Sequence, residues 1–375
     1  MRVVEASLHL VRLELVHEFQ TSSHRKASLG HILVKLVDES GAVGWGEIAS
    51  AATPFYNAEN VDTCWLVARD FVLPVLVGAT WEHPREVAPL WRKVRGNEFA
   101  KAGVDVAAWV LWSSANGVPL ATALGGTRDE VVAGVSLGIE PTVDDLLTQV
   151  AFHVEHGYPR VKLKIQPGWD VDPVRAVRSA WPDLDVHVDA NGVYTSSDED
   201  LAALRGLDGY GLTMIEQPFA PRDLLAHARF AATVGTPVCL DESVETLADL
   251  ELALHLRAGS VLNIKVSRMG GLTAAVAAHD LASAAGWPVW CGGMHEFGVG
   301  RYANVALSSL PGFTLPSDVS GSDKYYARDV VVPPVVADEG RVRVPTAAGL
   351  GGAIDEGFLG AVTLRSERLV VDDGH

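Results

Sequence analysis

Short apolar runs recur after residue 130, and stretches with helical spacing of apolar residues separate most of them. Each run has the length of a buried strand. The eight runs are AGVSLGI at 133, RVKLKI at 160, DVHVDANG at 185, LTMIEQP at 212, PVCLDES at 237, VLNIKV at 261, PVWCGG at 288 and FTLPSD at 313, about 25 residues apart. Alternation of strands and helices at this period predicts right-handed βαβ units and a parallel sheet. Eight such units favour a closed (β/α)8-type barrel over an open sheet.

The first third of the chain has a mixed pattern, which is typical of an α+β domain. Residues 3–15 alternate loosely, and residues 31–48 read as two strands joined by a turn at Asp38–Gly41. From about residue 57 to 115 the apolar spacing becomes helical, and Asn116-Gly117 is a helix stop.

These patterns divide the chain into three segments. Residues 1–125 form the α+β domain, and PLATALGGTRDE at 119–130 reads as a linker. Residues 126–320 form the barrel, while residues 321–375 break the period and are expected to return to the first domain.

Composition narrows the class of partner and the compartment. The formal charge is −17 and no basic stripe stands out, so nucleic acid and anionic membranes are not expected partners. Cys64, Cys239 and Cys291 are scattered and form no CxxC pair, which favours a reducing compartment. Charges interrupt the N-terminal stretch every few residues, so we expect neither a signal peptide nor a membrane span. A cytoplasmic protein is the prediction.

The second apolar run contains two lysines, which are costly to bury without compensation. Lys162 and Lys164 alternate with Val161, Leu163 and Ile165, so both lysines point to the same side of their strand. In a barrel of this kind the active site lies at the carboxyl ends of the strands. The lysines are therefore expected at the mouth of the barrel.

The next runs also carry polar residues at their carboxyl ends: Asp189 with Asn191, Glu216, Asp241 with Glu242, and Asn263 with Lys265. The separations from Lys164 through Asp189, Glu216 and Asp241 to Lys265 are 25, 27, 25 and 24 residues. One charged group per unit therefore faces a common mouth. Lysines flank three carboxylates in strand order.

Three converging carboxylates repel one another unless a cation holds them. Oxygen ligands from neighbouring strands suit Mg²⁺, with Mn²⁺ as a substitute, and the lack of His or Cys in the set disfavours zinc. A partly desolvated lysine near such a cation should have a lowered pKa and can act as a base. Mg²⁺ bound to a substrate carboxylate would stabilise the enediolate formed when the α-proton leaves. Lysines on opposite sides of the mouth could then racemise the substrate, or support elimination of a β-leaving group.

These residues resemble the enolase superfamily, and within it the muconate-lactonizing subgroup. The matching motifs, in chain order, are KLK at 162–164, VDAN at 188–191, IEQP at 215–218, CLDES at 239–243 and NIKVSRMGG at 263–271. The resemblance implies a modified (β/α)7β TIM-type barrel with an N-terminal α+β capping domain. It also implies Mg²⁺ ligands at Asp189, Glu216 and Asp241, acid/base residues at Lys164 and Lys265, tuning of Lys164 by Lys162, and supporting roles for Asn191 and Glu242.

Within that subgroup the chain is most similar, nearly end to end, to the N-succinylamino acid racemases and o-succinylbenzoate synthases. The resemblance implies dehydration to o-succinylbenzoate in menaquinone biosynthesis, racemisation of N-acylamino acids, or both. Arg268 matches a position associated with racemising members. Loops at 19–23 and 49–56 are expected to close over the mouth. The substrate contacts are expected at Phe19, Ser136, Gly292, Gly293, Met294 and His295.

Two residues depart from the pattern of that group. His295 stands where an aliphatic residue is expected, and Phe297 stands where a small hydroxyl residue is expected. Both lie beside the expected acyl pocket, so they bear on acyl preference rather than on the chemistry.

Other interpretations of the same residues remain open. A single acid after a strand is commonly a helix cap, and Lys162 alone could form a structural ion pair. A lysine with a lowered pKa also fits a Schiff-base aldolase. A dipeptide epimerase or muconate-type cycloisomerase would share the site but have a different pocket. A non-catalytic scaffold would have no reason to keep all five charged positions. We expect a small-molecule carboxylate substrate, and a homo-oligomer is compatible with the sequence.

Overall fold

The computed structural model describes residues 1–20 and 25–371, and the side chains of 18–20 and 25–26 lie outside that description. Its larger part is a curled sheet of seven parallel strands in the order β11-β10-β9-β8-β7-β6-β5. The strands are β5 (Val135–Leu137), β6 (Arg160–Lys164), β7 (Asp185–Asp189), β8 (Ile215–Glu216), β9 (Val238–Leu240), β10 (Val261–Ile264) and β11 (Val289–Cys291). Each strand lies within one of the apolar runs, which confirms the predicted parallel sheet.

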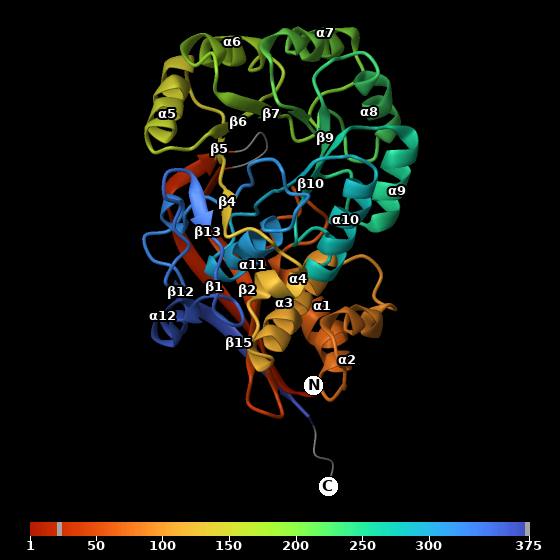
Figure 1. Cartoon of the computed structure of the whole chain (residues 1–375), viewed down its shortest axis with the longest axis vertical. Helices are drawn as coiled ribbons and strands as arrows, with labels where there is room; N and C mark the ends of the chain where they lie inside the picture. The colour runs from red at the N-terminus through yellow and green to blue at the C-terminus, as the bar shows by residue number, and fades with distance from the viewer. Residues whose placement is uncertain (21–24, 372–375) are drawn as a thin grey trace.

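A helix follows each of these strands and returns the chain to the start of the next one. The helices are α5 (Val143–Glu155), α6 (Val171–Ala180), α7 (Asp198–Gly206), α8 (Leu224–Ala231), α9 (Leu247–Leu256), α10 (Leu272–Ala284) and α11 (Gly298–Ser308). Helices α5 to α9 form an outer arc around the strands (Figure 1). Val161 and Leu163 on β6, and Ile165 directly after it, join the apolar cluster that includes residues of α5 and α6. Lys162 and Lys164 take the other face, as the alternation predicted.

The eighth apolar run, residues 313–318, differs from the regular strand expected of it. Phe313 forms an isolated parallel bridge with Val289 of β11, and Ser317 forms one with Ala133, just before β5. Pro316 has no backbone N–H and cannot donate to a continuous ladder. The run nevertheless links both edges of the seven-stranded sheet, so seven strand–helix units and a strand-like segment close the barrel.

The second part of the molecule is a four-stranded antiparallel sheet built from both ends of the chain. Its strands are β1 (Val3–Gln20), β2 (Arg25–Asp38), β3 (Val43–Ile48) and β15 (Thr363–Val370), in the order β15-β1-β2-β3. The predicted turn between β2 and β3 is present, with the Gly41 N–H donating to the Asp38 carbonyl at 3.0 Å. This sheet and its helices form the capping domain.

The helical elements of the capping domain are α1 (Val61–Val67), a π-helical turn (Ala68–Val72), α2 (Leu73–Leu76), 3₁₀ turns at Pro84–Glu86 and Ala88–Trp91, α3 (Glu98–Ala115) and α4 (Leu120–Leu124). Helix α3 ends at Asn116-Gly117, as predicted, and Gly117 has a φ of 67°. Helix α4 lies in the segment predicted as a linker, which corrects that prediction. Pro119 precedes its first turn, Gly125 ends it in the left-handed region, and its apolar face is buried.

The C-terminal segment contacts both parts of the molecule. Strand β13 (Arg341–Arg343) pairs with β4 (Glu130–Val132), and β12 (Val331–Val332) pairs with β14 (Ala353–Ile354). A 3₁₀ turn at Ser322–Lys324 follows the eighth run, and α12 (Glu356–Val362) precedes β15. Within residues 1–20 and 25–371, no helix has the length and apolar character of a membrane span. All three cysteines are buried free thiols.

Two buried carboxylates of the capping domain cap barrel helices. Glu47 on β3 accepts hydrogen bonds from the backbone N–H groups of Phe297 and Gly300 at the start of α11, both at 2.8 Å. Asp105 on α3 accepts from the Thr273 N–H at the start of α10, at 2.9 Å. A carboxylate at a helix N-terminus satisfies free N–H groups and complements the helix dipole. The capping domain is therefore held on the barrel by polar as well as apolar contacts.

Helix α3 packs against β3 so closely that side chains would not fit at the contact. A Cβ on Gly46 would lie 1.9 Å from the carbonyl oxygen of Gly103, and one on Gly44 would lie 2.2 Å from that of Ala107. We expect Gly46→Ala to lower the free energy of unfolding by about 3 kcal/mol, because backbone atoms of α3 would have to move. Equilibrium denaturation measures this change.

The matched control is Gly360→Ala in α12, where a Cβ would meet nothing within 4 Å. This variant should be neutral or slightly stabilised, because alanine favours the helix. A Gly46→Ala protein as stable as the wild type would contradict the close approach of α3 and β3.

Candidate active site

Three buried carboxylates from adjacent strands come together at the carboxyl ends of the barrel strands. Asp189 ends β7, Glu216 ends β8 and Asp241 directly follows β9. One oxygen from each lies within 4.8 Å of the others. Burial, together with the charge of Asp189, raises the pKa of Glu216 to about 8. Burial, and then the negative charge of the neighbouring acid, both favour the protonated form of Glu216.

The chemistry of these three side chains fits a hard divalent cation. Every ligand atom they offer is a carboxylate oxygen, the donor that Mg²⁺ prefers. Asn263 donates from Nδ2 to Oε1 of Glu216 at 2.7 Å and so orients the central carboxylate. Asp189, Glu216 and Asp241 are therefore the residues that would hold the cation, which would remove their repulsion.

Lys164 lies on one flank of the three acids. Its Nζ donates to Oδ2 of Asp189 at 2.5 Å and to Oδ1 of Asn191 at 2.6 Å. Asn191 in turn donates from Nδ2 to Oε1 of Glu242 at 2.9 Å. Burial and the charge of Asp241 raise the pKa of Glu242 to about 7. The structure thus brings the two expected supporting residues, Asn191 and Glu242, into one hydrogen-bonded chain with Lys164.

Lys162 lies below Lys164 on the same face of β6. Its Nζ is 3.1 Å from Oε2 of Glu216, 3.2 Å from Oδ2 of Asp189 and 3.4 Å from Oδ2 of Asp318. Burial by itself would lower the pKa of Lys162, but the carboxylates, Glu216 foremost, raise it well above its usual value. The ammonium is therefore held charged beside two of the acids, where it can influence Lys164 electrostatically.

Lys265 lies on the opposite flank, directly after β10. Its Nζ donates to Oδ2 of Asp241 at 2.7 Å and to the hydroxyl of Tyr56 at 3.0 Å. Arg268 also pairs with Asp241, and its Nε donates to the Val244 carbonyl at 2.9 Å. Burial would lower the pKa of Lys265, but Asp241 raises it above its usual value. The lowered pKa expected of a catalytic base stays a prediction for the cation-bound site, where Asp241 would be shared with the metal.

The segment after β11 lies against Lys265. A Cβ on Gly292 would lie 2.3 Å from Oδ1 of Asn263 and 2.8 Å from Cε of Lys265, so a side chain there would displace Asn263 and Lys265. Gly293 follows Gly292 along this segment, and Met294 packs against the apolar cluster of the capping domain.

His295 and Phe297, the two departures from the family pattern, lie at different depths. The His295 ring stacks on Tyr325 with centroids 4.8 Å apart. Phe297 is fully buried and packs between His31 and Tyr326, with ring centroids at 4.7 Å and 5.3 Å. Phe297 therefore occupies the contact between α11 and the capping domain.

The remaining two expected substrate contacts lie on different parts of the fold. Ser136 on β5 stands opposite Lys162 in the sheet register and donates from Oγ to Oδ2 of Asp318 at 3.0 Å. The backbone of Phe19 pairs with Lys26 near the end of β1, but its side chain lies outside the described residues. The same holds for most of the predicted closing loop at 19–23. The other predicted loop, at 49–56, brings Tyr56 to Lys265.

Asp318 is not among the residues predicted from the sequence, although it pairs with Arg160 and Lys162 in the polar network beside the three acids. It ends the eighth run, and its Oδ1 pairs with Arg160 at 2.8 Å. Asp318 could have been predicted in the same way as the other acids, because it is the polar residue at the end of an apolar run. No sequence signal indicated that the Tyr56 hydroxyl would contact both Lys265 and Arg268.

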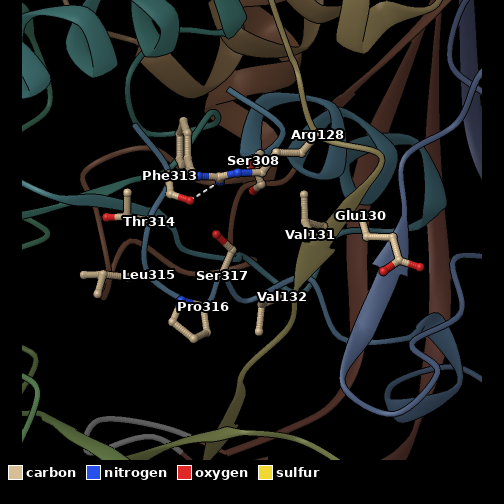
Figure 2. Close-up of a pocket in the computed structure, with 10 residues that line it drawn as sticks. All are labelled: Arg128, Glu130, Val131, Val132, Ser308, Phe313, Thr314, Leu315, Pro316 and Ser317. Carbon is tan, nitrogen blue, oxygen red and sulfur yellow. Dashed lines mark hydrogen bonds between the residues drawn. The ribbon is translucent and has the colours of Figure 1, made fainter. Parts of the chain in front are cut away.

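A separate cavity of about 250 Å³ lies beside β4 and the eighth run (Figure 2). It is lined by residues 128, 130–132, 308 and 313–317. The guanidinium of Arg128 donates there to backbone carbonyls, among them that of Pro311 at 2.9 Å and that of Phe313. Its lining includes none of the residues that surround the three acids, so this cavity is distinct from the candidate site.

The chain matches two protein-domain families in succession. Residues 5–125 match the family described as mandelate racemase / muconate lactonizing enzyme, N-terminal domain, and residues 145–358 match the one described as enolase C-terminal domain-like. The first match covers most of the capping domain. The second covers all the barrel strands after β5.

Individual relatives match over nearly their whole length. The chain is 44% identical to an o-succinylbenzoate synthase of Geobacillus kaustophilus, over 93% of this chain and 92% of that protein. It is 42% identical to an N-succinylamino acid racemase of an Amycolatopsis species, over 97% and 98%. A crystal structure of an enolase-superfamily member from Listeria innocua superposes with a TM-score of 0.96 at 35% identity, covering 99% of this chain and 100% of that one.

Proposed function

The chain belongs to the mandelate racemase / muconate lactonizing enzyme family of the enolase superfamily, and on that premise we propose a Mg²⁺-dependent enzyme that removes the proton α to a substrate carboxylate, giving an enediolate. The proposed reactions are dehydration to o-succinylbenzoate and racemisation of N-succinylamino acids. These are the activities named for the two relatives of the previous section.

A divalent cation held by Asp189, Glu216 and Asp241 would neutralise the negative charge that develops on the substrate carboxylate when the α-proton leaves. The protein's own part is to move that proton. Lys164 and Lys265 would face opposite sides of the α-carbon, because they flank the three acids from two directions. Removal by one amine and return by the other inverts the centre.

Dehydration uses the same groups differently. One lysine removes the α-proton and then gives it to the β-hydroxyl, which leaves as water, while the other lysine keeps its proton and stabilises the charge of the deprotonated substrate. Which output predominates depends on the substrate that the pocket admits.

The observation that carries this proposal is the placement of the two amines. Lys164 bonds to Asp189 at 2.5 Å and Lys265 bonds to Asp241 at 2.7 Å, on the two outer members of the acid trio. A Schiff-base aldolase needs one lysine and would leave the three acids without a role. A dipeptide epimerase or cycloisomerase would share this arrangement and differ in the acyl pocket.

The test is exchange of the substrate α-proton with solvent deuterium, followed by proton NMR on N-succinyl amino acids with Mg²⁺ present. We expect exchange and racemisation, loss of both on adding EDTA, and dehydration of the o-succinylbenzoate precursor in a parallel assay. If only dipeptides exchange their α-proton, the substrates are dipeptides and not N-succinyl amino acids. Activity that persists in EDTA, together with a covalent keto acid adduct of the protein after borohydride reduction, would show a Schiff-base mechanism in place of the proposed one.

A further inference from the structure

Lys324 brings a further ammonium close to β5 and to Asp318. It lies in the 3₁₀ turn after the eighth run, and its Nζ donates to the backbone carbonyl of Ser136, the middle residue of β5, at 3.0 Å. The same Nζ lies 5.3 Å from the centroid of the Tyr325 ring. Lys162, Lys164 and Lys265 each pair with a carboxylate, whereas Lys324 makes no ion pair within 4.0 Å among residues 1–20 and 25–371.

The nearby carboxylate, Asp318, is already engaged by other groups. Its Oδ1 pairs with Arg160 at 2.8 Å, and its Oδ2 lies 3.4 Å from Lys162 and 3.0 Å from the Ser136 hydroxyl. Arg160, Lys162 and the Ser136 hydroxyl therefore occupy both oxygens of Asp318, and Lys162 also pairs with Asp189 and Glu216. An anion arriving beside Lys324 would meet an ammonium that has no carboxylate partner within 4.0 Å among the described residues.

The ammonium of Lys324 has fewer hydrogen-bond acceptors around it than it can use. It has three N–H donors, and its partners are one backbone carbonyl and the face of one aromatic ring. The guanidinium of Arg301 lies over the same Tyr325 ring, 4.8 Å from its centroid. Burial lowers the pKa of Lys324 to about 7, although Asp318 opposes the shift. A bound anion would reverse this effect, since opposite charge stabilises the ammonium.

The position of Lys324 suits the far end of an extended substrate. Ser136 stands in register with Lys162 on the neighbouring strand, and Lys162 contacts Asp189. Strand β5 is two strands from β7, which corresponds to about 10 Å at the usual spacing. A molecule with a carboxylate at each end could place one at the three acids and the other near Ser136.

We propose that Lys324 binds the terminal carboxylate of the substrate's acyl group and thereby selects acyl groups that end in a carboxylate. The proposal rests on the function proposed above and deepens it, because it assigns the succinyl end of the substrate to a named side chain. Lys324 is a specificity residue that touches the substrate away from the reacting carbon.

The experiment compares N-succinyl and N-butyryl derivatives of one amino acid, which differ in the terminal carboxylate alone. The measured quantity is the ratio of their kcat/KM values for α-proton exchange, with the ratio of their Kd values from calorimetry in the presence of Mg²⁺. Both ratios are independent of the fraction of active protein. In Lys324→Met we expect the preference for the succinyl compound to fall by about tenfold or more, the size of a charge-assisted hydrogen bond.

Two further variants test whether the effect comes from the charge at position 324 or from losing any lysine beside an aromatic ring. Lys324→Arg keeps the charge and should retain most of the preference. Lys35→Met is the matched control, because the Lys35 ammonium on β2 also lies 5.3 Å from an aromatic centroid, that of Trp45, and should leave the preference unchanged.

The outcomes separate this proposal from the proposed function. An unchanged preference in Lys324→Met, or an equal fall in Lys35→Met, overturns the role of Lys324 while the enzyme remains active. Absence of exchange with either compound overturns the proposed function instead. The Kd ratio then decides the role of Lys324, which is rejected if the ratio survives in Lys324→Met and supported if it collapses.

Discussion

Replacing Lys265 by alanine is expected to reduce racemisation by at least about 10³-fold, in the range of a lost general acid–base group. The amine of Lys265 lies 2.7 Å from Asp241 on one flank of the acids, and that of Lys164 lies on the other. Lys265→Ala should therefore lose α-proton exchange for one enantiomer and keep it for the other. Lys164→Ala should show the reciprocal pattern. Proton NMR in D₂O on each enantiomer separately measures both.

Lys101→Ala is the control for removing a buried lysine. The Lys101 side chain is 11% exposed and pairs with Glu98 at 2.8 Å on α3 of the capping domain. This variant should exchange both enantiomers at the wild-type rate. If Lys164→Ala and Lys265→Ala do so as well, the two-base arrangement is wrong. A conservative change at Lys265 that removes racemisation and spares dehydration would separate the two roles of that amine.

Glu216→Gln is expected to weaken Mg²⁺ binding by about 100-fold or more and to remove most of the thermal stabilisation that Mg²⁺ gives. Glu216 is the central acid of the trio, lies fully buried, and is oriented by Asn263 at 2.7 Å. Its neutral isostere removes one of the anionic ligands that a hard cation requires. Calorimetric titration with Mg²⁺ measures the affinity, and melting curves with and without Mg²⁺ measure the linked stabilisation.

The control for this experiment is Glu59→Gln. Glu59 is also buried, but it accepts hydrogen bonds from the N–H groups of Phe99 and Ala100 at the start of α3, at 3.0 Å and 3.1 Å. It should bind Mg²⁺ as the wild type does, even if the protein is less stable. Wild-type affinity in Glu216→Gln, or no detectable binding in the wild type, would refute the metal site.

The core of the site could be predicted from the sequence because each functional residue ends a strand of a repeating unit. The spacing from Lys164 to Lys265 fixes one position per strand, and parallel strands bring their carboxyl ends together whatever the lengths of the helices between them. The β2–β3 turn and the end of α3 were also predicted from short local sequence motifs. At the end of α3, Gly117 adopts the left-handed conformation.

What the sequence did not reveal depends on contacts between distant segments. The Tyr56 hydroxyl reaches Lys265 across the domain contact, and Glu47 caps α11 from β3. No repeating sequence pattern predicts either contact, because each depends on how the capping domain packs on the barrel. The pairing of Asp318 with Arg160 follows from closure of the ring by an irregular eighth segment, which Pro316 keeps from forming a full strand.

The pairing of β15 with β1 has a consequence for synthesis of the chain. Glu5 lies opposite Val370, so β1 is synthesised 365 residues before the strand that covers its edge (370 − 5 = 365). At usual translation rates this interval is on the order of 20 s to a minute. During it the β1–β2 hairpin presents an open strand edge to other nascent chains. Loss of β15 through a premature stop codon would make that exposure permanent, and aggregation rather than a weakened catalyst would be the outcome.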